Sequence, residues 1–146
     1  MTKKILTLMA FVMLTISSVF AGGKDISKSA LTTFSGSFAK ATNVKWEKYE
    51  DYYKASFQMN GQSLNAFVSE QGDIIAVSRN ILSTGLPIGL QASLGKDFAT
   101  YWITDLTEYA VGNETKYYIT VENADGKITM ENVGTYDWSV TRKSAK

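Results

Sequence analysis

The sequence WEKYEDYYKASF, residues 46–57, contains the acidic pair Glu50-Asp51, and polar and apolar side chains alternate over residues 44–47 before it and 53–57 after it. Such alternation is typical of β-strands with one buried face, and two such strands around a polar pair indicate a hairpin. A four-residue loop over 49–52 gives the same register. The pairs that this hairpin predicts are Val44–Phe57, Lys45–Ser56, Trp46–Ala55, Glu47–Lys54, Lys48–Tyr53 and Tyr49–Tyr52.

Two further turns extend the hairpin into a four-stranded meander. Asn60-Gly61 is the strongest short hairpin signal in the chain, because both residues tolerate the positive φ angles of a type I′ turn. Gln71-Gly72 marks the next turn. The pairs predicted across these two turns are Tyr53–Val68, Ala55–Ala66, Phe57–Leu64, Val68–Ile75 and Ala66–Val77. All of them fall on the same face as Trp46, so the registers agree with one another.

The meander therefore has two different faces. The apolar face, which we expect to contact the core, carries Val44, Trp46, Tyr53, Ala55, Phe57, Leu64 and Val68. The second face, here called the open face, is predicted to carry Tyr49, Tyr52, Lys54, Asn65, Phe67 and Ile74.

A helix is predicted immediately before these strands. Ala30, Phe34 and Phe38 recur every four residues, which is the spacing of one helix face. Asp25 or Ser27 could cap its first turn. The first part of the chain is thus expected to be one helix followed by four strands.

The same order of elements recurs about 60 residues later. Leu86-Pro87 opens a second helical pattern, in which Leu90, Leu94 and Phe98 again recur every four residues. The segment FATYWITDLTEY, residues 98–109, aligns without a gap with FAKATNVKWEKY, residues 38–49. In the first strand of this second repeat, either Ile103 or Leu106 marks the buried side, and the pattern leaves both open.

The remaining strands of the second repeat follow from two glycine-containing loops, at 123–126 and near Val133-Gly134. These loops predict the pairs Ile119–Met130, Val121–Ile128, Met130–Tyr136 and Ile128–Trp138. Tyr118 then falls on the open face, together with Lys116 and Glu131. The loop ENADG, residues 122–126, lacks the ligand spacing of a calcium loop and is interpreted as a turn.

The N-terminus has the pattern of a secretory signal peptide. Lys3 and Lys4 precede an apolar stretch, and small residues lead to a predicted cleavage after Ala21. We therefore expect residues 1–21 to be removed and residues 22–146 to form a single domain of two repeats, at about 25–80 and 86–142. The mature protein is expected in the periplasm or outside the cell, with no membrane insertion after cleavage.

The composition excludes several chemistries. The chain has no cysteine and no histidine, which removes disulfides, Cys–His and Ser–His–Asp catalysis, and zinc sites built on thiolate or imidazole. Loss of Lys3 and Lys4 would change the net charge from +1 to about −1, and this balance does not favour nucleic acid. We expect no cofactor and no bound metal.

Three segments together resemble a known family. NVKWEKYEDYYKASFQMNG (43–61), the glycine turn EQGDII (70–75) and Leu86-Pro87 resemble the PepSY-like, β-lactamase-inhibitor-like family of small exported bacterial proteins. The resemblance covers nearly the whole mature chain. It implies an α+β fold like that of β-lactamase inhibitor protein, in which two repeats of a helix and a four-stranded antiparallel meander form one sheet with helices on one face. The chain lacks the disulfides of β-lactamase inhibitor protein itself, so the resemblance implies the fold and not β-lactamase inhibition.

These features favour a non-catalytic, monomeric module that binds a protein or peptide through the open face. An inhibitor of an envelope or secreted enzyme would be one such module. Aromatic residues mixed with charges on an exposed sheet face are typical of a binding surface. The candidate binding residues are Tyr49, Tyr52, Lys54, Phe67, Ile74 and Tyr118. We expect Tyr49 and Phe67 to be exposed and dispensable for folding.

Two other functions are alternatives. A protein that binds a small apolar ligand would need a cavity between helix and sheet, near Phe34, Phe38 and Trp46. A hydrolase based on carboxylates could use Glu50-Asp51, but both carboxylates would be solvated at a hairpin tip.

Overall fold

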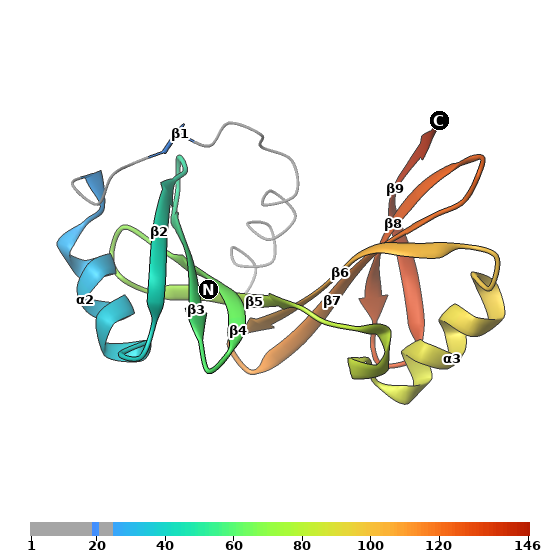
Figure 1. Cartoon of the computed structure of the whole chain (residues 1–146), viewed down its shortest axis with the longest axis horizontal. Coiled ribbons are helices and arrows are strands. Elements are labelled where there is room, and N and C mark those ends of the chain that lie inside the picture. The colour runs from blue at the N-terminus through green and yellow to red at the C-terminus, as the bar shows by residue number, and fades with distance from the viewer. Residues whose placement is uncertain (1–18, 21–24) are drawn as a thin grey trace. The chain divides into compact units, whose positions relative to one another are not determined.

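The computed structural model describes residues 19–20 and 25–146 (Figure 1). The chain divides into two compact units, Met1–Val77 and Ser78–Lys146. Each strand lies next to its neighbour in the chain, in the order β1 to β9. The predicted α+β class, a tandem repeat of a helix and a four-stranded antiparallel meander, is confirmed. The elements are β1 (Val19–Phe20), α2 (Lys28–Ser37), β2 (Thr42–Lys48), β3 (Tyr53–Met59), β4 (Gln62–Val68), β5 (Ile74–Asn80), η2 (Ser83–Gly85), α3 (Ile88–Asp97), β6 (Trp102–Val111), β7 (Glu114–Glu122), β8 (Gly126–Val133) and β9 (Asp137–Ala145).

Most of the predicted signal peptide, including the cleavage position after Ala21, lies outside the described residues. Its described part is β1, which pairs with Glu47 and Lys48 of β2. Cleavage after Ala21 would remove this short strand. In the part of the chain that the structure covers, no helix has the length and apolarity needed to cross a bilayer.

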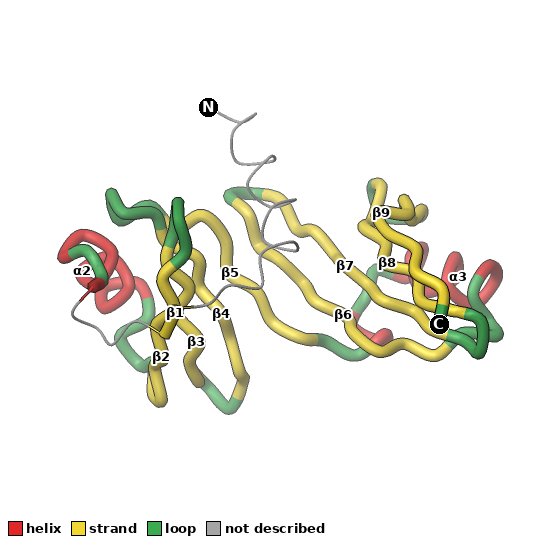
Figure 2. Tube along the Cα trace, turned by 90° about the horizontal axis from the view of Figure 1, so that it is seen from above, coloured by secondary structure: helices red, strands yellow, loops and turns green. Residues whose placement is uncertain are grey.

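Helix α2 is fixed at its start by Ser27 rather than by Asp25. The Ser27 Oγ atom accepts a hydrogen bond from the Ala30 N–H at 3.1 Å and donates one to the Glu70 carbonyl at 2.7 Å. The first bond satisfies an N–H group of the first helical turn, and the second ties the helix to the β4–β5 turn. Figure 2 shows α2 lying against one face of the strands of its unit.

The core of the first unit is built around the Phe34 ring. Its centroid lies 5.2 Å from that of Phe38, 5.1 Å from that of Trp46 and 5.1 Å from that of Phe57. Ala55 and Ala66 are fully buried beneath these rings, where small side chains leave room for aromatic ones. The apolar face predicted from the sequence is therefore the face that α2 covers.

The predicted register of the first two hairpins is confirmed. Trp46 pairs with Ala55, Glu47 with Lys54, and Phe57 with Leu64. Asn60 and Gly61 have φ angles of 51° and 75°, as a type I′ turn requires. The ladder is irregular between Thr42 and Lys45, so the predicted Val44–Phe57 pair is not formed and Val44 is exposed.

The β4–β5 turn differs from the prediction by one residue. The Ser69 N–H donates to the Asp73 carbonyl at 2.9 Å, and the Gly72 N–H donates to the Ser69 carbonyl at 3.0 Å. Gly72, at a φ angle of 93°, inserts one extra residue as a bulge. Alternation from the Ser69–Asp73 pair puts Ala76, which is 2% exposed, on the apolar face in place of Ile75. The same shift moves Ile74 off the open face and replaces it with Ile75, which corrects one predicted site residue.

The second unit repeats the first, with a spacing of 60 residues between the two helices. Helix α3 begins and ends 60 residues after α2. The Phe98 N–H donates to the Leu94 carbonyl, as that of Phe38 does to Phe34, and both helices end there. The core contains the fully buried side chains Leu90, Ile119, Val121 and Met130.

A bulge in β6 resolves the two alternatives left open for its buried side. Ile103 pairs with Val121 and Leu106 pairs with Ile119, with an irregularity between Ile103 and Asp105. The extra residue brings both side chains to the same face, but only Leu106 is buried there, whereas Ile103 is exposed. The irregularity in β2 lies at the aligned position, so the repeat extends to this detail of the backbone.

The last hairpin has a different register from the predicted one. Met130 pairs with Val140, and Asn132 with Trp138, instead of the predicted Met130–Tyr136 and Ile128–Trp138 pairs. Strand β8 extends further towards the turn than predicted, and the Asn132 side chain holds this end in place. Asn132 accepts a hydrogen bond from the Tyr117 N–H and donates one to the Gly134 carbonyl, both at 2.7 Å. Trp138 still packs against the core of this unit. The predicted Ile119–Met130 and Val121–Ile128 pairs are confirmed.

Candidate functional site

Three aromatic side chains gather on the open face of the first unit. The Tyr49 and Tyr52 rings are stacked, with centroids 4.7 Å apart and an interplanar angle of 12°. The Phe67 ring lies 5.9 Å from that of Tyr52. The stack forms because the Tyr49 N–H donates to the Tyr52 carbonyl at 2.9 Å, which places the two residues opposite each other at the hairpin tip. We call these three residues the tyrosine cluster.

A polar group borders the tyrosine cluster. The Glu47 carboxylate accepts a hydrogen bond from the Tyr49 hydroxyl at 2.9 Å and another from Lys54 Nζ at 3.3 Å. Both partners approach the same carboxylate oxygen, and Glu47 and Lys54 are cross-strand neighbours. The open face thus presents an aromatic ring next to a partly buried ion pair.

The rings of this face are less exposed than the sequence predicts. Tyr52 is 5% exposed and Phe67 is 4% exposed, whereas Tyr49 is half-buried. The expectation that Phe67 is exposed is therefore wrong. Tyr52 lies between the Tyr49 and Phe67 rings, and Tyr49 and Lys54 are the more accessible residues of this face.

Tyr118 belongs to a separate cluster in the second unit. Its ring lies 5.4 Å from that of Tyr109 at an angle of 83°, and its strand partner is Glu131. Tyr118 is buried, and burial, followed by the charge of Glu131, raises the pKa of its hydroxyl well above the usual range. Like Tyr52, Tyr118 is covered by neighbouring residues and exposes little of its own surface.

The environment of Tyr49 also stabilises its neutral form. Burial, the hydrogen bond to Glu47 and the negative charge of that carboxylate raise the pKa of Tyr49 to about 12. Burial also raises the pKa of Tyr52, with further contributions from Glu47 and Asp51. Neither tyrosine can serve as a base near neutral pH, because each keeps its proton.

Alkaline pH is expected to destabilise the folded protein through Tyr49. Its pKa in the folded state, about 12, exceeds the ordinary value of 10.0. The folded state therefore binds this proton more tightly, so the stability that it contributes is present below about pH 10 and is lost as the pH rises towards 12. Denaturation at a series of pH values should show a smaller loss for Tyr49→Phe than for the wild type. The control Tyr136→Phe, at an exposed position, should retain the wild-type loss; equal losses in all three proteins would contradict this assignment.

No catalytic constellation is evident among the described residues. Glu50 and Asp51 are exposed at the hairpin tip. Across residues 19–20 and 25–146, no group of three or more carboxylates lies close enough to hold a metal ion. The 122–126 loop is closed by Asn123, whose Oδ1 atom accepts hydrogen bonds from the N–H groups of Asp125 and Gly126.

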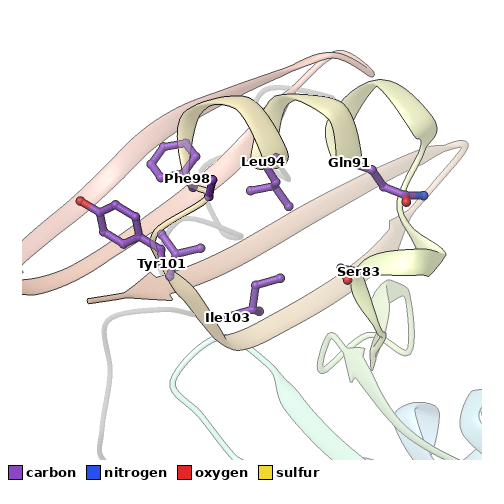
Figure 3. A pocket seen from close by; sticks show the side chains of 9 residues that line it. Ser83, Gln91, Leu94, Phe98, Tyr101 and Ile103 are labelled. Carbon is purple, nitrogen blue, oxygen red and sulfur yellow. The ribbon is translucent and has the colours of Figure 1, made fainter. Parts of the chain in front are cut away.

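Two hollows in the second unit were not predicted from the sequence. The first has a volume of about 280 Å³ and lies between α3 and the start of β6 (Figure 3). The second, of about 320 Å³, lies between residues 80–83 and 103–106. A cavity between Phe34, Phe38 and Trp46 was the alternative predicted for the first unit. The Phe34 ring contacts the rings of Phe38 and Trp46 and occupies this position.

Comparison with known proteins relates the chain to others by fold. No protein-family model matches the chain, and no curated protein sequence matches it. A BLIP-like protein from Bacteroides fragilis has a TM-score of 0.68 at 17% identity, covering 85% of this chain and 89% of that one. A DUF2874 family protein from Bacteroides ovatus has a TM-score of 0.72 at 19% identity, covering 84% and 89%. A Bacteroides eggerthii protein named as periplasmic has a TM-score of 0.72 at 14% identity, covering 82% and 88%.

These identities are low, and they establish a shared fold and nothing more. The resemblance to β-lactamase inhibitor protein noted in the sequence is thus supported at the level of the fold, whereas membership of the PepSY-like family stays a prediction. The chain therefore has the fold of the BLIP-like and DUF2874 family proteins.

Proposed function

We propose that this chain is a non-catalytic, exported module that binds a protein or peptide through its open face. The observation that carries the proposal is the constellation of Tyr49, Glu47 and Lys54. An aromatic ring held in place by stacking is the kind of side chain that is enriched at the centres of protein interfaces, and the Glu47–Lys54 ion pair beside it has the character of the polar rim.

The tyrosine cluster suits this role because it is ordered before binding. The Tyr49 ring is held by Tyr52 on one side and by the Glu47 hydrogen bond at its hydroxyl. A partner would therefore lose little side-chain entropy when it contacts the ring. Tyr52 contacts the Tyr49 ring directly, and Phe67 packs behind Tyr52. In the second unit, Tyr118 packs against Tyr109 in a similar way.

Export to the periplasm or the exterior is part of the proposal. It is supported by the signal-peptide pattern of residues 1–21 and by the similarity in fold to a protein named as periplasmic. The intact mass of the secreted protein tests it. A chain beginning at Gly22 is expected, and an uncleaved chain in the soluble fraction would contradict export by this signal.

The binding proposal is tested by capture from an envelope extract, with the mature chain as bait and mass spectrometry as readout. Tyr49→Ala should reduce retention of the captured partner at least about tenfold, the effect of losing one aromatic anchor. The matched control is Tyr136→Ala, since Tyr136 is an exposed tyrosine of the β8–β9 turn. Undiminished retention by Tyr49→Ala, or an equal loss in the control, would contradict binding through the open face.

A further inference from the structure

The outer edge of β2 is covered by a strand that a cleaved chain would lack. Val19 and Phe20 of β1 pair antiparallel with Lys48 and Glu47 of β2. Both residues of β1 belong to the predicted signal peptide, so cleavage after Ala21 would uncover this edge. Of the strands that the structure describes, β3 would then be the only neighbour of β2. The mature chain would therefore present a free strand edge here.

This edge offers main-chain groups to another strand. The Tyr49 N–H donates to the Tyr52 carbonyl, so Tyr49 turns its main chain towards β3. Because this direction alternates along a strand, Glu47 also faces β3, whereas Trp46 and Lys48 direct their N–H and C=O groups to the outer edge. Loss of β1 would leave these groups to water. A row of such groups is a template for the addition of a strand.

The second repeat already holds a strand at the corresponding edge. The gap-free alignment of the repeats makes residues 106–108 the counterparts of the edge residues of β2. The Leu106 carbonyl accepts a hydrogen bond from the Ile81 N–H at 3.0 Å, and Glu108 accepts one from Arg79 Nε at 2.8 Å. The residue numbers rise on one side as they fall on the other, so this neighbour is antiparallel, as β1 is to β2. In both repeats this edge therefore pairs with a strand from another part of the chain.

Two lysines give the edge of β2 a positive charge. Lys45 and Lys48 are both exposed, and neither forms an ion pair with any residue that the structure describes. Glu47, in contrast, is already bonded to Lys54 and to the Tyr49 hydroxyl. Carboxylates opposite the two lysines would thus favour an added strand, and basic residues would disfavour it. A second copy of this edge fits less well than an acidic segment, because it would bring two more lysines to the same place.

We propose that the β2 edge of the mature chain binds an extended, acidic segment of a protein partner as an added antiparallel strand. The inference rests on the proposed export, since cleavage after Ala21 frees the edge, and it adds the kind of partner that would bind. The main chain of the segment would bond to Trp46 and Lys48, where β1 lies in the uncleaved chain. Acidic side chains at its first and fourth positions would lie opposite Lys48 and Lys45. The main-chain bonds would supply affinity, and the two charges would select acidic sequences.

The test uses the peptide acetyl-Glu-Thr-Val-Glu-amide and the mature chain labelled for NMR. The peptide matches the length of the regular part of β2, which begins at Lys45. Saturating peptide should slow hydrogen exchange at the amides of Trp46 and Lys48 and leave that of Glu47, which faces β3, unchanged. Absence of this protection would overturn the proposal. So would protection of the same two amides without peptide that rises with protein concentration, because it would identify a second copy as the occupant.

Two N-methylated forms of the peptide separate strand addition from capture by side chains. N-methylation of the valine removes an N–H group that would face β2, and it should weaken binding at least about tenfold. N-methylation of the threonine is the matched control. It alters an N–H group that would face solvent, and it should leave the affinity within about twofold. Equal affinities of the two methylated peptides would contradict main-chain pairing.

Charge reversal tests the location of the site. The double variant Lys45→Glu/Lys48→Glu should bind the acidic peptide at least about tenfold more weakly and should instead prefer acetyl-Lys-Thr-Val-Lys-amide. The matched control is Arg142→Glu/Lys143→Glu, which makes the same change of net charge at two exposed residues of β9. This control should keep the wild-type affinity. An unchanged preference in the Lys45/Lys48 variant, or an equal loss in the control, would contradict the proposed location.

The edge proposal and the open-face proposal can fail separately. Tyr49→Ala should leave binding of the acidic peptide within about twofold, because the peptide bonds to the main chain of Trp46 and Lys48. A chain that fails to bind the peptide would leave partner capture through the open face standing. A chain that binds the peptide but captures its partner equally well after Tyr49→Ala would contradict the open-face proposal alone.

Discussion

Phe34→Ala is expected to lower the free energy of unfolding by about 3–5 kcal/mol, the usual cost of emptying an aromatic site in a core. Phe34 is buried, and its ring contacts those of Phe38, Trp46 and Phe57. Removal of this ring would leave a cavity that fixed strands on one side and the helix backbone on the other cannot close. Chemical denaturation followed by tryptophan fluorescence measures the loss, since Trp46 lies next to the ring.

The control for this change is Phe34→Leu, which introduces the residue of the second repeat. It should cost less, about 1–2 kcal/mol, because most of the apolar volume is kept. A loss below about 1 kcal/mol for Phe34→Ala would mean that the ring is not enclosed as described.

Gly72→Ala is expected to destabilise the protein by about 2–4 kcal/mol, through two separate effects. The φ angle of 93° is strained for any residue with a side chain. An added Cβ atom would also lie 2.9 Å from the Ser29 carbonyl oxygen of α2, which is backbone and cannot move aside. Thermal or chemical denaturation of the purified variant provides the measurement.

Gly36→Ala is the matched control for this substitution. Gly36 lies in α2, where no atom is within 4 Å of an added Cβ and the φ angle is not positive. Alanine there should stabilise the protein by about 0.5–1 kcal/mol, because it reduces the freedom of the unfolded chain. Equal effects of the two glycine substitutions would show that the β4–β5 turn does not pack on α2.

Local signals in the sequence were enough to predict most of the fold. Asn60-Gly61 specified a turn that only one hairpin register satisfies, and the apolar residues on either side agreed with it. The repeat was visible because FATYWITDLTEY, residues 98–109, aligns without a gap with FAKATNVKWEKY, residues 38–49. Errors arose where one residue changed the register, at the Gly72 bulge and at the last hairpin, because a bulge has no periodic signature.

The candidate site was harder to predict than the fold. Alternation assigned Tyr52 and Phe67 to a face, but exposure depends on how rings pack on one another, and the Tyr49–Tyr52 stack was not evident from spacing.

The most direct test of the proposed function is photo-crosslinking from two positions of the mature chain in an envelope extract. A benzophenone side chain at position 45, which is exposed and lies on the same face as Glu47, probes the open face without replacing Tyr49, and one at position 32 lies on the exposed side of α2. The proposal predicts a discrete crosslinked partner from position 45 and none from position 32. A partner crosslinked from position 32 alone, or equally from both positions, would contradict binding through the open face.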